Sequence, residues 1–449
     1  MAPSSRSRPT SSPCPTTCRR RGTTGRALIR PAESAGNSST VKGSGTRAPG
    51  SAAFIFIFVT VALDMMAVGI TVPVLPKLII QFQHGDVARA AWFVGAFATL
   101  WAAMQFIFSP IIGAASDRFG RRPVILLSNL GLGLDYVLMA VAPTLGWLFL
   151  GRLISGITSA SYPTAGAYIA DVTPPAERAG KFGMLGAAFG LGFIVGPAVG
   201  GVLGGIDLRL PFWVAAGLSL ANTAYGFFIL PESLPPERRR PFSLKNAHVF
   251  GSFRLLRSHP ELLGLAAALF VMGLAHEALP NTFVLYADQR YGWTEAQVGL
   301  ALAGIGVSSV VVSMLLVKPM VRRLGERRAA LAGLAFGIGG FLTFGLAPTG
   351  GIFLIGIALV ALWGLANPSF QSLMSRRIDP SEQGQLQGAL GSIRAVTGML
   401  GPLVFTHVFA VAVGHGGQSL LGAPFLLSAA LLLLTMVVGA RVLPHRPPS

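Results

Sequence analysis

The sequence of 449 residues contains few charged residues and few cysteines. Only 12% of its residues are Asp, Glu, Lys or Arg, against about 25% in soluble domains, while 52% are hydrophobic. The two cysteines, Cys14 and Cys18, both lie in the first 50 residues. The low charge excludes an ordinary soluble domain, and the cysteine count excludes a disulfide framework or a cysteine metal site in the rest of the chain.

Nucleotide-binding and zinc motifs are also missing. No Gly-x-x-x-x-Gly-Lys-Ser/Thr occurs, and the glycines between Gly190 and Gly196 lie within an apolar run rather than after a strand. His276 and Glu277 are not followed by a second His at the spacing of a zinc site. We find no nucleophile with a matching base and no metal ligand set. The sequence therefore predicts a protein that is not an enzyme, has no cofactor and takes its energy from an ion gradient.

From residue 51 onward, apolar runs of roughly 18 to 26 residues recur, and each is long enough to cross a hydrocarbon core of ~30 Å as a helix. Helices are expected because every backbone polar group in lipid needs an internal partner. The sequence predicts an all-α polytopic membrane protein with twelve transmembrane helices, at residues 53–75, 90–115, 124–141, 145–170, 180–203, 212–230, 262–285, 298–317, 329–346, 352–374, 386–411 and 423–443.

The first 50 residues are rich in Ser, Thr, Pro and Gly, and they carry many basic residues against a single acid, Glu33. We expect this basic tail to be disordered because nothing in it can form a core. Its composition is that of an organellar transit peptide, and equally that of a bacterial reading frame whose start codon is assigned too far upstream. We favour the second interpretation, with translation beginning near Val41.

Almost all basic residues fall on one side of the predicted membrane. Of the 35 Lys and Arg residues, only Lys77, Arg89, Arg209 and Arg290 lie in loops on the other side. Because positively charged loops stay in the cytoplasm, we expect a multi-pass protein of a bacterial inner membrane with both termini cytoplasmic. The basic charges line loops rather than one binding face, so no nucleic-acid partner is expected.

The two halves of the chain resemble each other at a shift of 205 residues. Ala-Pro-Thr at 142–144 recurs at 347–349, and Gly-Pro at 196–197 recurs at 401–402. The repeat predicts two six-helix bundles of the same topology, at 51–230 and 261–443, joined by a cytoplasmic linker at 231–260 and followed by a tail at 444–449. In transporters built this way the substrate cavity lies between the halves.

A string rich in Gly and Arg joins the second and third predicted spans. Gly120 allows a tight turn, Asp117 can cap a helix, and the arginines can pair with an acid such as Asp171 at the end of the fourth span. Such pairs would open and close as the halves move. The alternative is a positive-inside anchor without a gating role. The candidate gating residues are Gly113, Asp117, Arg118, Gly120, Arg121, Arg122 and Asp171.

Several strings identify a family that the sequence resembles. Residues 113–123 (GAASDRFGRRP) are similar to the signature of the major facilitator superfamily, 148–156 (LFLGRLISG) resembles its second motif, and 192–201 (GFIVGPAVGG) resembles the motif of its drug:proton antiporters. Residues 63–76, 133–136, 291–293 and 383–388 resemble the bacterial tetracycline efflux proteins. The resemblance covers 52–443 and implies the superfamily fold. Its antiporter motif, either a hinge or a site of tight helix packing, comprises Gly192, Gly196, Pro197, Gly200 and Gly201.

Three ionisable residues lie inside predicted spans of the first half. Asp64 is at the centre of the first span, where a charged carboxylate is unfavourable, so we predict that it loads and releases a proton. Asp135 and Arg152 are symmetric about the turn between spans three and four, and we predict that they pair at equal depth and take part in proton coupling. Alternatively, Asp64 caps a helix that is broken near Pro73, and Asp135 and Arg152 form a purely structural ion pair.

The second half lacks these charges, because under the shift the three positions are Leu269, Gly340 and Ile357. We therefore expect the first half to handle the proton and the second half to contribute more of the substrate wall. Tetracycline antiporters carry a His in span eight and an Asp in span nine, and the aligned residues here are Ser309 and Gly337. The candidate substrate-binding residues are Gln105, Gln371, His276, Glu277 and Arg394.

The resemblance implies a monomeric secondary transporter that exports tetracycline, or a similar amphiphilic drug, in exchange for protons, with a divalent metal carried only as part of the substrate. The expected partners are the drug, protons and the lipid bilayer. Three alternatives stay open: an exporter or facilitator of another drug or metabolite without this coupling, a nutrient-uptake carrier of the same fold, and a membrane sensor or scaffold, for which the short loops leave little surface.

Overall fold

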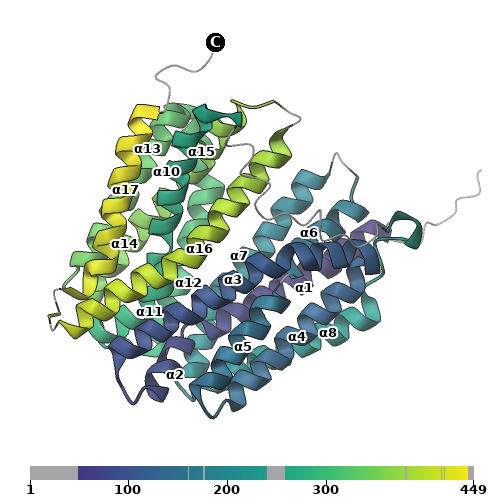
Figure 1. The fold of residues 1–449 in the computed structure, drawn as a ribbon, viewed down its shortest axis with the longest axis horizontal. Helices are drawn as coiled ribbons and strands as arrows, with labels where there is room; N and C mark the ends of the chain where they lie inside the picture. The colour runs from purple at the N-terminus through teal and green to yellow at the C-terminus, as the bar shows by residue number, and fades with distance from the viewer. Residues whose placement is uncertain are drawn as a thin grey trace, which may run out of the picture. The chain divides into compact units, whose positions relative to one another are not determined.

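A computed structural model describes residues 49–159, 161–174, 177–239, 258–379, 382–415, 417–418 and 420–442. The predicted basic tail, apart from its last two residues, lies outside the described residues, as do residues 240–257 of the predicted linker and the tail at 444–449. All regular secondary structure within the described ranges is helical (Figure 1).

The helices of the amino-terminal half are, in chain order, α1 (Pro49–Thr71), α2 (Leu75–Phe82), α3 (Val87–Phe119), α4 (Arg121–Val141), α5 (Leu145–Thr158), α6 (Ser161–Val172), α7 (Arg178–Gly204), α8 (Leu210–Ile229) and the short 3-10 helix η1 (Pro236–Arg238). Those of the carboxy-terminal half are α10 (Pro260–His276), α11 (Ala278–Tyr291), α12 (Glu295–Val311), the π-helical turn η3 (Val312–Leu316), α13 (Val317–Leu346), α14 (Gly350–Leu362), η4 (Trp363–Leu365), α15 (Ala366–Ser375), α16 (Gln383–Gly414), η6 (Leu420–Gly422) and α17 (Ala423–Val442).

Ten stretches of the described chain are long and apolar enough to cross a membrane. One of them, Glu295–Leu346, holds two predicted spans, because the backbone leaves the helical conformation at Gly325, where φ is 74° and ψ is 161°. The fourth predicted span is formed by α5 and α6, which have 14 and 12 residues. The ten stretches therefore hold eleven of the predicted spans, and α5 and α6 correspond to the remaining one. The all-helical membrane fold is confirmed, and the count of twelve spans is consistent with it.

Besides the span formed by α5 and α6, the spans formed by α1 with α2 and by α10 with α11 are also interrupted. The first predicted span, 53–75, continues further than expected: α1 ends at Thr71, Pro73 lies in the turn that follows, and α2 extends the span to Phe82. Proline lacks the N–H that a continuing helix needs, which favours a break at this point. A second interruption separates α10 from α11 at Glu277. Discontinuous helices of this kind commonly form substrate and ion sites in transporters.

Each half has a hydrophobic core of its own, and Ala91 of α3 joins the core of the carboxy-terminal half. In the carboxy-terminal half, fully buried aromatic rings gather around Phe353, which lies 4.1 Å from the ring of Phe344 and 5.5 Å from that of Phe283. In the amino-terminal half, buried side chains such as Tyr136 and Phe212 form the largest cluster. Many large apolar side chains remain exposed on the outside of the helices, as expected for surfaces that contact lipid.

The halves meet along two pairs of helices. The middle of α3 packs along α16, where Thr99 Oγ1 donates a hydrogen bond to the backbone oxygen of Met399 at 2.9 Å (Figure 1). On the other side of the interface α7 packs along α12, where Gly201 and Gly299 approach closely. Small residues allow such close approach of two helix backbones.

Three polar contacts join the halves at the end of the bundle where α3 and α12 begin. The Lys77 ammonium lies 3.1 Å from Asp288 Oδ1 and 3.1 Å from Glu295 Oε1, and it donates a hydrogen bond to the backbone oxygen of Trp293 at 3.2 Å. We call these contacts the Lys77 clasp. Lys77 belongs to α2 and its partners to the carboxy-terminal half, so the clasp holds this end of the interface together. The opposite end, where α8 finishes and α10 begins, is called the linker end.

Candidate functional site

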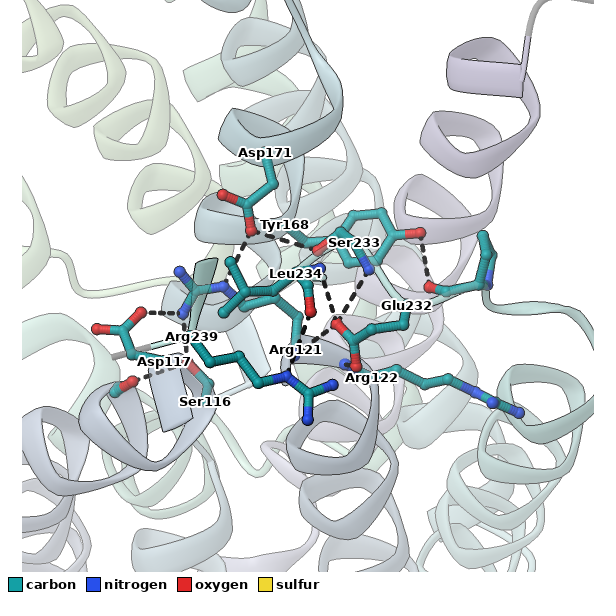
Figure 2. Close-up of polar contacts among 12 residues, drawn as sticks. Ser116, Asp117, Arg121, Arg122, Tyr168, Asp171, Glu232, Ser233, Leu234 and Arg239 are labelled. Carbon is teal, nitrogen blue, oxygen red and sulfur yellow. Dashed lines mark hydrogen bonds and ion pairs between the residues drawn. The ribbon is translucent and has the colours of Figure 1, made fainter. Parts of the chain in front are cut away.

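At the linker end, the guanidinium of Arg121 is the centre of a network that joins α3, α4 and α6 (Figure 2). Its Nη1 lies 2.6 Å from Asp117 Oδ1, its Nε lies 3.1 Å from Asp171 Oδ2, and Nη1 also donates to Ser116 Oγ. The structure thus brings Arg121 and Asp171 together in the contact expected from the sequence. The gating role of this contact stays a prediction.

A carboxylate that the sequence analysis missed, Glu232, lies at the amino terminus of α4. Its oxygens accept hydrogen bonds from the backbone N–H of Arg121 at 2.9 Å and of Arg122 at 3.3 Å (Figure 2). A negative charge at this position satisfies free N–H groups and interacts favourably with the helix dipole. Gly120 has φ of 105°, and a Cβ there would meet the Glu232 carboxylate, so both the turn and the contact require glycine.

The expectation that Asp117 caps a helix is wrong. Asp117 lies in the last turn of α3, and its carboxylate pairs with Arg121 four residues later. The start of α4 is capped instead by Glu232, which is distant in sequence but follows α8 directly. Of the remaining gating candidates, Arg118 lies over the ring of Phe119 at 5.4 Å, and Gly113 borders open space.

Asp64 is buried inside α1, with 1% of its surface exposed. The amide of Asn222, on α8, donates hydrogen bonds to Asp64 Oδ1 at 2.9 Å and to the backbone oxygen of Thr60 at 3.0 Å. Because Asp64 lies well before the end of α1, it does not cap a broken helix. The sequence analysis missed Asn222, although an amide within an apolar span is the kind of signal that marks a buried polar contact.

Asp135 and Arg152 face each other across α4 and α5. Arg152 Nη2 lies 3.8 Å from Asp135 Oδ2, and the carboxylate is fully buried. The same Nη2 donates to the sulfur of Met139 at 3.1 Å. A Cβ on Gly151 would lie 2.7 Å from Asp135 Oδ1, so the close approach of α5 depends on this glycine. The symmetry of the two residues about the turn thus led to a pairing that the structure contains, while their role in proton coupling stays a prediction.

The glycines of the candidate antiporter motif pack against backbone on two sides of α7. A Cβ on Gly192 would lie 2.6 Å from that of Met65, and a Cβ on Gly196 would lie 2.7 Å from the backbone oxygen of Met66, both on α1. Gly200 faces α1 in the same way, whereas Gly201 faces α12 of the other half. Pro197 lies inside α7. These contacts agree with the interpretation of the motif as a site of tight helix packing. Its role as a hinge stays a prediction.

Two cavities bring the candidate substrate residues together. The central cavity, of about 730 Å³, is lined by both halves, including Gln105 of α3 and Arg394 of α16. The carboxy-terminal cavity, of about 630 Å³, is lined by residues of the second half. Arg394 lines both cavities. The carboxy-terminal cavity also contains the remaining candidates from the sequence, namely His276, Glu277 and Gln371.

The central cavity lies on the linker side of the interface. It is lined by Gln105, Ser109 and Pro110 from the later part of α3 and by residues 388–398 from the first half of α16. Its remaining wall is largely apolar and includes the stacked rings of Phe189 and Phe193, 5.0 Å apart. Such a wall suits an amphiphilic ligand with fused or aromatic rings.

Comparisons with known proteins agree with this architecture. The family model of the Major Facilitator Superfamily matches residues 57–402. The chain belongs to this superfamily. Among proteins of the superfamily, it is similar to the tetracycline resistance protein, class C, of Escherichia coli, with 37% identity over 384 residues, 86% of this chain and 95% of that protein. The class B protein of Escherichia coli is 35% identical over 382 residues, 84% of this chain and 94% of that protein.

Solved structures of the superfamily share the fold at lower identity. The human organic anion transporter MFSD10 gives a TM-score of 0.64 at 24% identity, covering 88% of this chain and all of that chain. The nucleoside transporter NupG gives a TM-score of 0.71 at 14% identity, covering 88% of this chain. The resemblance to the superfamily and to its tetracycline resistance proteins, expected from the motifs, is therefore confirmed.

Two positions of the superfamily fold depart from the tetracycline antiporter pattern, and the structure explains one of them. Ser309 lines the carboxy-terminal cavity, and its hydroxyl donates to the backbone oxygen of Ile305 at 2.8 Å. Gly337 is buried, and a Cβ there would lie 2.9 Å from Cγ of Trp363 and 2.8 Å from Leu432 Cδ1. The indole of Trp363 thus takes up the space that a carboxylate at 337 would need. Among the residues that the structure describes, no group of three or more His, Cys, Asp or Glu could hold a metal ion.

Proposed function

We propose that this protein is a proton-coupled exporter of tetracycline, as its metal chelate, or of a similar amphiphilic drug. The observation that carries the proposal is the position of two buried carboxylates beside a cavity lined by both halves. Met65, next to Asp64, and Leu132, one helical turn before Asp135, both line the central cavity. The substrate class follows from the similarity to the tetracycline resistance proteins.

Asp64 and Asp135 are suited to carry protons because an ionised carboxylate in a low-dielectric interior is unfavourable without a full counter-charge. Asn222 donates a hydrogen bond to Asp64 from a neutral amide. Arg152 stabilises the ionised form of Asp135, and their contact weakens when Asp135 takes a proton. Proton binding at Asp135 therefore alters the contact between α4 and α5, two helices that line the central cavity.

The direction of transport follows from the predicted topology. With the basic loops in the cytoplasm of a bacterium, the linker end faces the cytoplasm and the Lys77 clasp faces the outside. In this arrangement the described conformation is closed on the outside, and the central cavity accepts drug from the cytoplasmic side. Protons entering from the outside would then drive export by one monomer, without a nucleotide or a bound cofactor.

A facilitator of another drug or metabolite is the second candidate. The observation that favours it is the absence of ionisable side chains at Ser309 and Gly337, where tetracycline antiporters carry a His and an Asp. If these two groups are required for coupling, the carrier equilibrates its substrate without using the proton gradient.

Drug uptake into everted membrane vesicles tests the proposal. With an imposed pH gradient, acidic inside, wild-type vesicles should accumulate tetracycline, and a protonophore should abolish the accumulation. Asp64→Asn and Asp135→Asn should each remove accumulation, whereas Asp207→Asn, an exposed acid in the loop before α8, should not. If tetracycline only equilibrates, and a protonophore leaves this unchanged, the protein is a facilitator. If the vesicles accumulate other drugs but not tetracycline, tetracycline is rejected as the substrate.

A further inference from the structure

The carboxy-terminal cavity contains two opposite charges that do not pair with each other. Glu277 lies at the interruption between α10 and α11, Arg394 lies on α16, and both line the cavity. Within the described ranges, neither side chain lies within ion-pair distance of an opposite charge. The amide of Asn281 donates to Glu277 Oε2 at 3.1 Å and so orients the carboxylate without neutralising it.

Glu277 and Arg394 meet α16 at different points along its axis. The side chain of Glu277 packs against Gly401, where a Cβ would collide with it. Gly401 follows Arg394 by seven residues of continuous helix, which corresponds to about 10 Å along the helix axis. That spacing separates the two backbone positions, and the cavity of about 630 Å³ that both side chains line has room for a molecule with several fused rings.

The Glu277 end of the cavity has the features of a cation site. The ring of His276 lies 5.7 Å from that of Trp363, and both line the cavity beside the carboxylate. Aromatic faces next to a carboxylate attract an ammonium group through cation–π and Coulomb interactions. The indole N–H of Trp363 is buried and has no hydrogen-bond partner among the described residues.

The Arg394 end has the features of an anion site with room for a ligand. The guanidinium offers several N–H donors in one plane, and it lies where the central and carboxy-terminal cavities adjoin. The glycines on either side, Gly391 and Gly398, border open space, so no side chain of α16 covers the guanidinium from these positions. An anionic group can therefore approach it from the central cavity.

We propose that Glu277 and Arg394 are specificity-determining residues that bind the cationic and the anionic group of a zwitterionic, multi-ring substrate. The inference rests on the proposed function only in assuming that the cavity admits an amphiphilic drug. A zwitterion of suitable length pairs with both charges at once, whereas a purely cationic or purely anionic molecule pairs with only one of them. The second half of the chain thus selects substrates by charge, although it lacks the ionisable groups found in the first half.

Binding of four probes to the purified full-length protein in detergent tests this inference. The probes are tetracycline and ciprofloxacin, which are zwitterions, ethidium, which is a cation, and nalidixate, which is an anion. Dissociation constants from ligand-induced thermal shifts are compared for wild type, Glu277→Gln and Arg394→Gln. Glu237→Gln and Arg238→Gln, at exposed positions of η1, serve as matched controls.

The expected result is a crossed pattern. Wild type should bind at least one zwitterion more tightly than either singly charged probe. Glu277→Gln should weaken binding of the zwitterions and of ethidium by about tenfold and leave nalidixate unchanged, while Arg394→Gln should weaken the zwitterions and nalidixate by about tenfold and leave ethidium unchanged. The unchanged probe shows that each variant is folded, and the two controls should bind all probes as wild type does.

The inference is overturned if wild type prefers neither zwitterion, if both variants bind zwitterions as tightly as wild type, or if each variant loses all four probes equally. Wild-type binding of tetracycline with no effect of either variant would reject the inference and leave the proposed function intact. The crossed pattern with ciprofloxacin, without binding of tetracycline, would support the inference and reject the proposed substrate.

Discussion

Replacing Lys77 by Met removes the cation of the Lys77 clasp and should open the end of the interface where α3 and α12 begin. The lysine ammonium contacts two carboxylates, Asp288 and Glu295, each at 3.1 Å, and the backbone oxygen of Trp293. All of these partners belong to the other half of the chain. In a transporter whose halves rock about a central cavity, opening this end must break these contacts, so their strength sets part of the equilibrium.

The free energy that the clasp contributes to the closed state can be judged from the burial of its three charged side chains. Lys77 is 13% exposed, and its two acidic partners are 28% and 20% exposed. Exposed ion pairs contribute about 0–1 kcal/mol and breaking a buried pair costs about 3–5 kcal/mol, so we expect about 2 kcal/mol for this intermediate case. Loss of about 2 kcal/mol from the closed state shifts the equilibrium toward the open state by about 30-fold.

Distances between spin labels measure this shift. Labels at Gln81 on α2 and at Gln418 before α17 report the separation of the halves at this end, in a background where Cys14 and Cys18 are replaced by Ser. The Lys77→Met variant should show a larger population of long distances between the labels than the labelled protein that keeps Lys77. High salt should raise the population of long distances in wild type, because screening weakens the clasp. The difference between wild type and Lys77→Met should therefore be smaller in high salt.

Arg89 provides the matched control for the loss of a cation at the same end. It lies 4.0 Å from Asp86 of its own half, and the side chains are 69% and 49% exposed. Arg89→Met should therefore leave the distance distribution unchanged. The reasoning is refuted if Lys77→Met also leaves the distribution unchanged, or if both variants alter it equally.

Three further predictions concern stability, measured as the melting temperature of the purified protein. Glu232→Gln removes the charge at the start of α4 and should cost about 1 kcal/mol, and an unchanged melting temperature would show that the charge contributes nothing there. Gly200→Ala should cost roughly 1–3 kcal/mol because a Cβ overlaps the backbone of α1, whereas Gly186→Ala on the same helix faces open space and should be neutral; equal effects would contradict the packing account. Gly337→Asp should lower the melting temperature because Trp363 fills the site, and Trp363→Ala should then cost less in the Gly337→Asp background than in wild type; equal losses in the two backgrounds would reject the steric explanation.

The helical, membrane-spanning character of the apolar runs was determined by the sequence itself. An apolar run long enough to cross lipid has to be helical, because its backbone groups find no partner outside the run, and this constraint acts locally. The same local logic located the Asp135–Arg152 pair, since a short turn between two antiparallel helices places equidistant residues at equal depth. The family was recognisable because its motifs are short, contiguous strings such as residues 113–123.

Contacts between distant segments were decided only by the tertiary structure. Asn222 beside Asp64 and Glu232 at the start of α4 depend on how helices are rotated about their own axes and which neighbours they meet. An apolar span is hydrophobic on every side, so its sequence carries little information about that rotation. For the same reason only the folded chain revealed that Arg394 lines two cavities and that Lys77 joins the halves. Packing between helices more than one hundred residues apart selects these pairs, and no local pattern encodes it.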